Sequence, residues 1–97
     1  MLDELGSLPG EMTLADRQRA EGDLVGAVAT LERVLLANPG ADEARLIHAS
    51  LLCRLDDPAG ARVEIGQLAG HAVADAAWAE VVAACGALPR PVAGVGR

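Results

Sequence analysis

The sequence contains no lysine, phenylalanine or tyrosine, and Trp78 is the single tryptophan among its 97 residues. Strands favour aromatic and β-branched side chains, so this scarcity makes an all-β fold improbable. Hydrophobic residues still make up 52% of the chain, mainly as alanine, leucine and valine. Because alanine and leucine have high helix propensity, the composition predicts one small all-α domain with closely packed helices.

Long apolar runs are also missing. The longest stretch without an acidic or basic residue is residues 65–74, far shorter than the ~20 apolar residues that a membrane-spanning helix needs. The N-terminus is acidic and lacks the cationic start and apolar core of a secretory signal. We therefore expect no direct membrane insertion and a cytoplasmic location, or a periplasmic one if the sequence is an excised module.

Basic residues are few. The chain has eight arginines and 14 acidic residues, which gives a formal net charge of −6. The arginines are scattered singly among the acids, so no basic patch is available for a phosphate backbone, and nucleic acid is not expected as a partner. The two cysteines, Cys53 and Cys85, are too few for a disulfide scaffold and match no metal-ligand spacing. We interpret them first as small buried hydrophobic residues.

A shift of 34 residues brings two parts of the sequence into register. Segment 23–27 (DLVGA) then falls on segment 57–61 (DPAGA). In each copy an aspartate precedes an apolar stretch and is suited to cap the start of a helix, while Gly22 suits the end of the preceding one. The shift therefore indicates a repeated pair of helices. Around these segments it also pairs Ala15 with Ala49, Leu31 with Ile65, and Val34 with Leu68.

Apolar residues that recur at intervals of three and four predict five helices along the chain. The first begins at residue 9 or 14 and ends at 21. The others are expected at residues 24–37, 41–55, 58–69 and 74–85. The final segment has two prolines and no amphipathic pattern, which is typical of a disordered tail.

These features resemble the tetratricopeptide repeat, a unit of about 34 residues that consists of two helices. The first copy carries the resemblance at Leu14, Ala15, Gly22, Asp23, Ala27, Leu31, Val34 and Pro39, and the second at Ala49, Leu52, Asp56, Asp57, Ala61, Ile65 and Leu68. The second copy departs from the pattern, with His48 in the place of Leu14 and Val73 in the place of the exit proline. Trp78 resembles the tryptophan that opens a further repeat.

The resemblance implies a short right-handed superhelix of about five helices. We expect a flexible N-terminus at residues 1–8, a first repeat at 9–40, a second repeat at 41–73, a capping helix at 74–87 and the disordered tail at 88–97. Such a module interacts with other proteins and has no catalytic role.

The resemblance also implies a concave surface, lined by the first helix of each repeat, that binds a peptide or a partner protein. The alternative is that these positions are ordinary solvated helix residues. A clamp of lysine, arginine and asparagine on a peptide's terminal carboxylate is not expected, because the chain has no lysine. The candidate surface consists of Met12, Asp16, Arg19, Glu43, Leu46, Ser50, Cys53 and Arg54.

The helix expected at 74–85 carries Trp78, Val81, Val82 and Cys85 on one face. This face either packs into the core, which we favour for Trp78, or pairs two copies of the chain as a homodimer. A further alternative is that the chain is the N-terminal helical module of a larger bacterial envelope protein.

Residues with catalytic or metal-binding chemistry are isolated. His48 is expected in the core and His71 in an exposed turn. A spacing of five residues points His48 and Cys53 apart around a helix, so they form no shared metal site. The paired Asp56 and Asp57 are explained by helix capping. We therefore expect no cofactor, no metal and no enzymatic activity, and keep a Cys/His hydrolase or metal site only as a formal alternative.

Overall fold

The computed structural model describes residues 8–94, where five helices follow one another without a strand. The all-α fold is thus confirmed, and apart from the start of the first helix the observed helix ends equal the expected ones or differ from them by at most three residues. The flexible segment expected at residues 1–8 lies outside the described residues except for its last one, which begins α2. The helices are α2 (Leu8–Ala20), α3 (Leu24–Ala37), α4 (Asp42–Arg54), α5 (Pro58–Gly66) and α6 (Asp75–Cys85).

The turns within the two helix pairs have the same backbone geometry. The chain adopts the left-handed conformation at Gly22 (φ +83°) and again 34 residues later at Asp56 (φ +69°). A residue in this conformation ends a helix because it turns the next amide back onto the last helical carbonyls. The sequence repeat is therefore a structural repeat. The equivalent hydrogen bonds are Asp23 N to Gln18 O and Asp57 N to Leu52 O, both 2.8 Å.

The second helix of each pair begins with the same cap. The carboxylate of Asp23 accepts a hydrogen bond from the amide of Gly26, and that of Asp57 accepts one from Gly60, each at 3.0 Å. Each cap satisfies one of the amides that the first turn of a helix leaves without a partner. The capping predicted from the sequence is confirmed at both aspartates.

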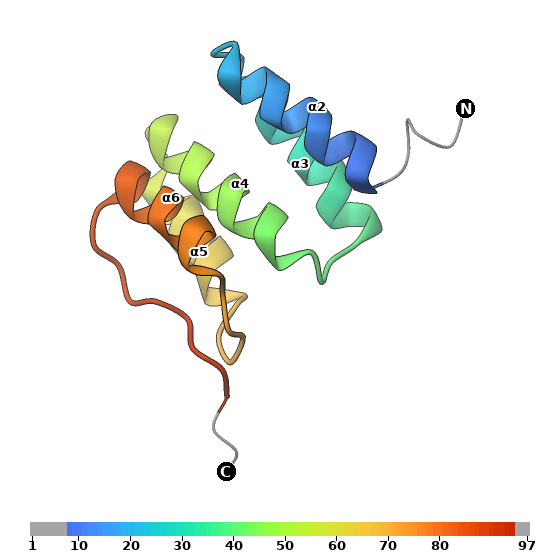
Figure 1. Ribbon diagram of the computed structural model, residues 1–97. Helices are drawn as coiled ribbons and strands as arrows, with labels where there is room; N and C mark the ends of the chain where they lie inside the picture. The colour runs from blue at the N-terminus through green and yellow to red at the C-terminus, as the bar shows by residue number, and fades with distance from the viewer. Residues whose placement is uncertain (1–7, 95–97) are drawn as a thin grey trace.

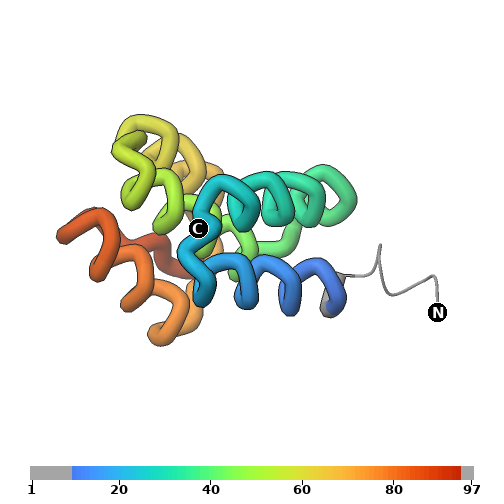
Figure 2. The backbone as a smooth tube through the Cα atoms, turned by 90° about the horizontal axis from the view of Figure 1, so that it is seen from above, coloured from blue at the N-terminus to red at the C-terminus, as the bar shows by residue number. Residues whose placement is uncertain are grey.

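The helices form two layers. In Figure 1, α4 lies between α2 and α6 at the front, and α3 and α5 lie behind them. Figure 2 shows the same arrangement from above, with α2 and α6 on one side of the stack and α3 and α5 on the other. No helix in the described part of the chain is both long and apolar enough to cross a membrane.

The core consists of two clusters that share α4. The buried apolar residues of α4 divide between them: Ala44, Ile47 and Leu51 face the first cluster, whereas Leu46 and Ala49 face the second. Helix α4 is therefore the centre of the stack and joins the first helix pair to α6. The first cluster also contains Ala15, Ala27, Leu31 and Val34, and the second Ala61, Ile65, Leu68, Ala77, Trp78 and Val81.

The chain continues after α6 as an extended strap, residues 87–94, that returns along α5. Arg90 donates hydrogen bonds to the carbonyl oxygen of Val73 (2.8 Å) and to Asp75 (2.6 Å). Near the end of the strap, the amide of Gly94 donates to the carbonyl oxygen of Gly70 (2.8 Å). The disordered tail expected at 88–97 is therefore wrong for residues 88–94, because these contacts fix the strap against the stack. Residues 95–97 lie outside the described range.

Candidate functional site

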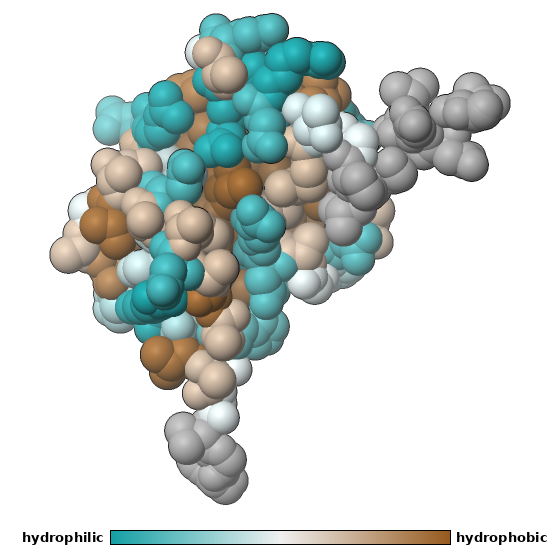
Figure 3. Space-filling view, in the orientation of Figure 1, coloured by the Kyte–Doolittle hydropathy of each residue, from teal (hydrophilic) through white to brown (hydrophobic). Residues whose placement is uncertain are grey.

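Helices α2, α4 and α6 share the face of the stack that is turned to the viewer in Figures 1 and 3. All eight residues of the candidate surface lie on α2 or α4, but they differ in accessibility. Asp16, Glu43 and Arg54 are exposed, and Met12, Arg19 and Cys53 are half-buried. Leu46 and Ser50 are only 1% and 3% exposed.

The burial of Leu46 corrects its expected role. Its side chain packs in the second core cluster with Trp78 and Val81, so it holds α6 in place and presents nothing to a partner. The hydroxyl of Ser50 donates to the carbonyl oxygen of Ile47 at 2.7 Å, within its own helix.

A hollow of about 300 Å³ lies between α4 and α6. We call it the α4–α6 hollow; it is lined by Ser50, Arg54, Glu80, Ala83 and Ala84. The two alanines end at Cβ, which leaves open space beside the longer arginine and glutamate side chains. The side chain of Arg54 forms no ion pair or hydrogen bond with any residue of 8–94, which leaves its guanidinium available to a partner as far as these residues are concerned.

The α6 side of this hollow was not predicted from the sequence. It consists of Glu80, Ala83 and Ala84, whereas the predicted face of this helix contained Trp78 and Val81. Helical spacing could have indicated these residues. A helix that buries Trp78 and Val81 directs the side chains at its other positions to a different face.

Arg19 connects the two outer helices of this face. Its guanidinium contacts Asp16 on its own helix and Glu80 on α6, each at 3.1 Å. Its Nε atom is buried and has no hydrogen-bond partner among residues 8–94. Since Glu80 also lines the α4–α6 hollow, the Arg19–Glu80 ion pair forms part of its border.

A second hollow of about 200 Å³ lies at the start of α4 and is lined by Met12, Ala41, Asp42, Glu43 and Ala44. Two of the expected surface residues, Met12 and Glu43, belong to it, whereas Ser50 and Arg54 belong to the α4–α6 hollow. Four of the eight candidate residues therefore line a hollow, two in each.

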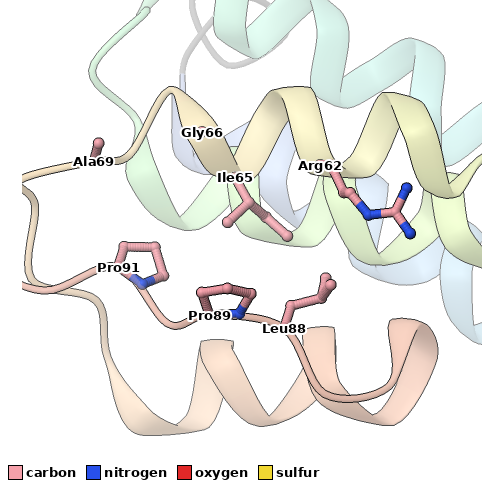
Figure 4. A pocket seen from close by; sticks show the side chains of 7 residues that line it. All are labelled: Arg62, Ile65, Gly66, Ala69, Leu88, Pro89 and Pro91. Carbon is pink, nitrogen blue, oxygen red and sulfur yellow. The ribbon is translucent and has the colours of Figure 1, made fainter.

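An apolar groove of about 370 Å³ lies between α5 and the strap. In Figure 4, Leu88, Pro89 and Pro91 of the strap lie opposite Ile65, and Arg62 lies at one end. The sequence analysis missed this groove because it treated the tail as disordered. Gly66 and Ala69 complete the lining.

The residues expected as a dimer face are mostly used within one chain. Trp78 is 8% exposed, so the core alternative is confirmed for it, and Val81 is fully buried. Cys85 is half-buried, and only Val82 is clearly exposed, at 41%. This corrects the expectation of one continuous apolar face, because α6 turns three of the four side chains toward its neighbours in the stack.

Cys53 and Cys85 form a disulfide, with a Cα–Cα distance of 5.3 Å. This corrects their interpretation as two separate buried hydrophobic residues. The sequence gave no pairing signal, because 32 positions separate the cysteines and only the packing of α6 against α4 brings them together.

The two histidines each lie beside acidic side chains. His48 is 5% exposed, so its prediction as a core residue is confirmed. Its Nε2 atom lies 3.3 Å from Glu32, and its Nδ1 atom lies 3.5 Å from Glu64 but forms no hydrogen bond with residues 8–94. His71 is exposed, as predicted, and its Nδ1 atom lies 2.9 Å from Asp42. Within residues 8–94, no group of three or more His, Cys, Asp or Glu side chains could hold a metal ion.

Comparison with known proteins gives one match. A family model described as tetratricopeptide repeat matches residues 18–85, which include both repeated turns and all of α3 to α6. No curated protein and no solved structure matches the chain. Together with the 34-residue spacing of Gly22 and Asp56, the family match shows that the chain belongs to the tetratricopeptide repeat family.

Proposed function

We propose that this chain binds a peptide or a partner protein along the face formed by α2, α4 and α6. Tetratricopeptide repeats generally mediate protein–protein interaction and are typically non-catalytic. The observation that carries the proposal is the α4–α6 hollow, which lies on this face and is lined by Arg54, whose side chain has no ion pair or hydrogen bond with residues 8–94. In this proposal the chain has no enzymatic role and needs no cofactor.

The chemistry of the hollow favours one inserted side chain of a peptide. Ala83 and Ala84 offer methyl groups, while Arg54 offers hydrogen-bond donors at the border. A binding site with an apolar wall and a few polar groups at its edge gains affinity from burial and specificity from the polar groups. Contacts of this kind at the centre of an interface are the ones whose loss costs most.

Peptide display on the isolated chain tests this function. A random-peptide library is panned against the oxidised protein, and selected peptides are titrated against Ala83→Trp, which fills the hollow. Ala79→Trp is the matched control, because Ala79 is an exposed residue of the same helix that does not line the hollow. We expect Ala83→Trp to weaken binding by about tenfold or more, which corresponds to ~1.4 kcal/mol, and the control to leave it unchanged.

Two outcomes would contradict the proposal. One is a library that yields no specific peptide. The other is a set of peptides that bind wild type and Ala83→Trp equally well. Circular dichroism of both variants checks that the added indole has not unfolded α6.

Self-association and membership of a larger envelope protein stay as alternatives. A homodimer would have to use Val82 and other exposed residues, since Trp78 and Val81 are buried in the core. Light scattering over a wide concentration range tests this, because a mass that stays at the 9.9 kDa of one chain contradicts the dimer.

The disulfide supports an oxidising compartment over the cytoplasm. Disulfides persist in secreted and periplasmic proteins and are rare in the cytosol, where thiols are kept reduced. We therefore favour the periplasmic alternative. Alkylation of free thiols with a polyethylene-glycol maleimide in intact cells tests it, because a chain with the Cys53–Cys85 bond gains mass only after reduction.

A further inference from the structure

We propose that the Cys53–Cys85 disulfide is a site of thiol–disulfide exchange that controls whether α6 is fixed against α4. In the oxidised chain the α4–α6 hollow exists, and in the reduced chain α6 separates and the hollow is lost. The reactant is a dithiol in the reducing direction and a disulfide in the oxidising direction. The effect of reduction on α6 does not depend on the proposed function, whereas the effect of reduction on partner binding rests on it.

The disulfide lies at one end of the α4–α6 hollow. Cys53 is in the last turn of α4, and Cys85 is the last residue of α6. Their neighbours in the sequence, Arg54 and Ala84, both line the hollow, one on each side. The bond therefore joins the two walls directly beside the residues that would contact a partner.

Apart from the disulfide, α6 is held by its buried residues and by the ion pairs Arg19–Glu80 and Arg90–Asp75. Only Ala77, Trp78 and Val81 of its 11 residues are buried, and the exposed positions include Ala79 and Val82. Helix α6 is the last helix of the stack and packs mainly on α4. In a repeat protein each unit is held by its neighbours alone, so a terminal helix is the element most prone to local opening.

The disulfide is not enclosed in the core. Both cysteines are half-buried, in contrast to the fully buried residues Val81 and Ala49 nearby. A thiolate of the dithiol attacks one sulfur of the pair and forms a mixed disulfide, which the second thiolate of the reagent resolves. Cys53 and Cys85 leave as two thiols that have taken up two electrons and two protons, and the reagent becomes a disulfide.

Hydrogen exchange measured with and without dithiothreitol tests the proposal. The amides of α6 are compared with those of α3, which belongs to the other core cluster and serves as the internal control. We expect reduction to speed exchange in α6 by about tenfold or more and to leave α3 unchanged. Emission of Trp78, the single tryptophan, should shift to the red as its buried indole meets water.

Cys53→Ser/Cys85→Ser is the matched variant, since it lacks the bond in any buffer. Its α6 amides should exchange quickly with or without dithiothreitol. Equal exchange of α6 in the oxidised and reduced wild type would overturn the proposal. Equal acceleration in α3 and α6 would overturn it as well, because the disulfide would then stabilise the whole fold and not control α6 alone.

The display-selected peptides separate this inference from the proposed function. They are titrated against oxidised and reduced wild type, with the double serine variant as the control for direct effects of the reductant. Loss of affinity on reduction, together with fast exchange in α6, supports both proposals. Fast exchange in α6 with unchanged affinity supports the switch and contradicts the hollow as the binding site.

Discussion

Arg19 of α2 and Glu80 of α6 form an ion pair of 3.1 Å although 61 residues separate them. Helix α4 lies between these two helices, as Figure 1 shows. The ion pair therefore connects α2 to α6 over α4. The contact therefore joins the first and the last helix of this face directly.

The Arg19–Glu80 pair should shape the face more than it stabilises the fold. Glu80 is about half exposed (52% of its side chain), so solvent screens the attraction. For exposed pairs the coupling is usually about 0.2–1 kcal/mol. We expect this value from a double-mutant cycle with Arg19→Gln and Glu80→Gln in urea denaturation. A coupling free energy above about 2 kcal/mol would contradict the assignment as a surface pair.

Substitution of the small core residues by larger ones should destabilise the fold. Ala27 and Ala61 occupy equivalent positions in the two repeats and are fully buried. Ala27→Leu and Ala61→Leu should each lower the free energy of unfolding by about 1–3 kcal/mol, because the added atoms have no space at the helix crossing. The control is Ala29→Leu, an exposed position of α3. Thermal melts that equal wild type in both core variants would refute the close-packed repeat.

The two repeated turns should respond oppositely to substitution. Asp56 adopts the left-handed conformation that Gly22 adopts 34 residues earlier, and a side chain makes this conformation costly. Asp56→Gly should therefore raise the free energy of unfolding by about 0.5–1 kcal/mol, and Gly22→Ala should lower it by about 1 kcal/mol. Urea denaturation of both variants measures the difference. A loss of stability in Asp56→Gly would mean that its side chain holds the turn.

The fold was predictable because its signals are local. The caps at Asp23 and Asp57, the helix end at Gly22 and the 34-residue period depend on neighbouring residues and repeat along the chain. Helix α5 shows the limit of such signals. It ends at Gly66, before the expected residue 69, because the next amides bond three residues back and form a turn.

The candidate site was predictable only in part, because it depends on contacts between distant segments. Helical spacing placed Asp16, Arg19 and Arg54 on the correct helices but could not show that Leu46 points into the core. Glu80 and the Cys53–Cys85 bond depend on how α6 packs against α4, which no local pattern specifies. The strap was missed for the same reason, since its partners are far away in the sequence.

The strap should contribute measurably to stability. Leu88 is half-buried and packs on the second core cluster, whereas Val92 in the same strap is 66% exposed. Leu88→Ala should lower the free energy of unfolding by about 1–2 kcal/mol. This loss is smaller than that for a fully buried leucine, because part of the Leu88 side chain is already exposed to water. Val92→Ala, the matched control, should change it by no more than about 0.5 kcal/mol. Urea denaturation compares the two variants. If the strap were disordered in solution, both substitutions would be silent, and an unchanged unfolding midpoint for Leu88→Ala would contradict its packing against α5.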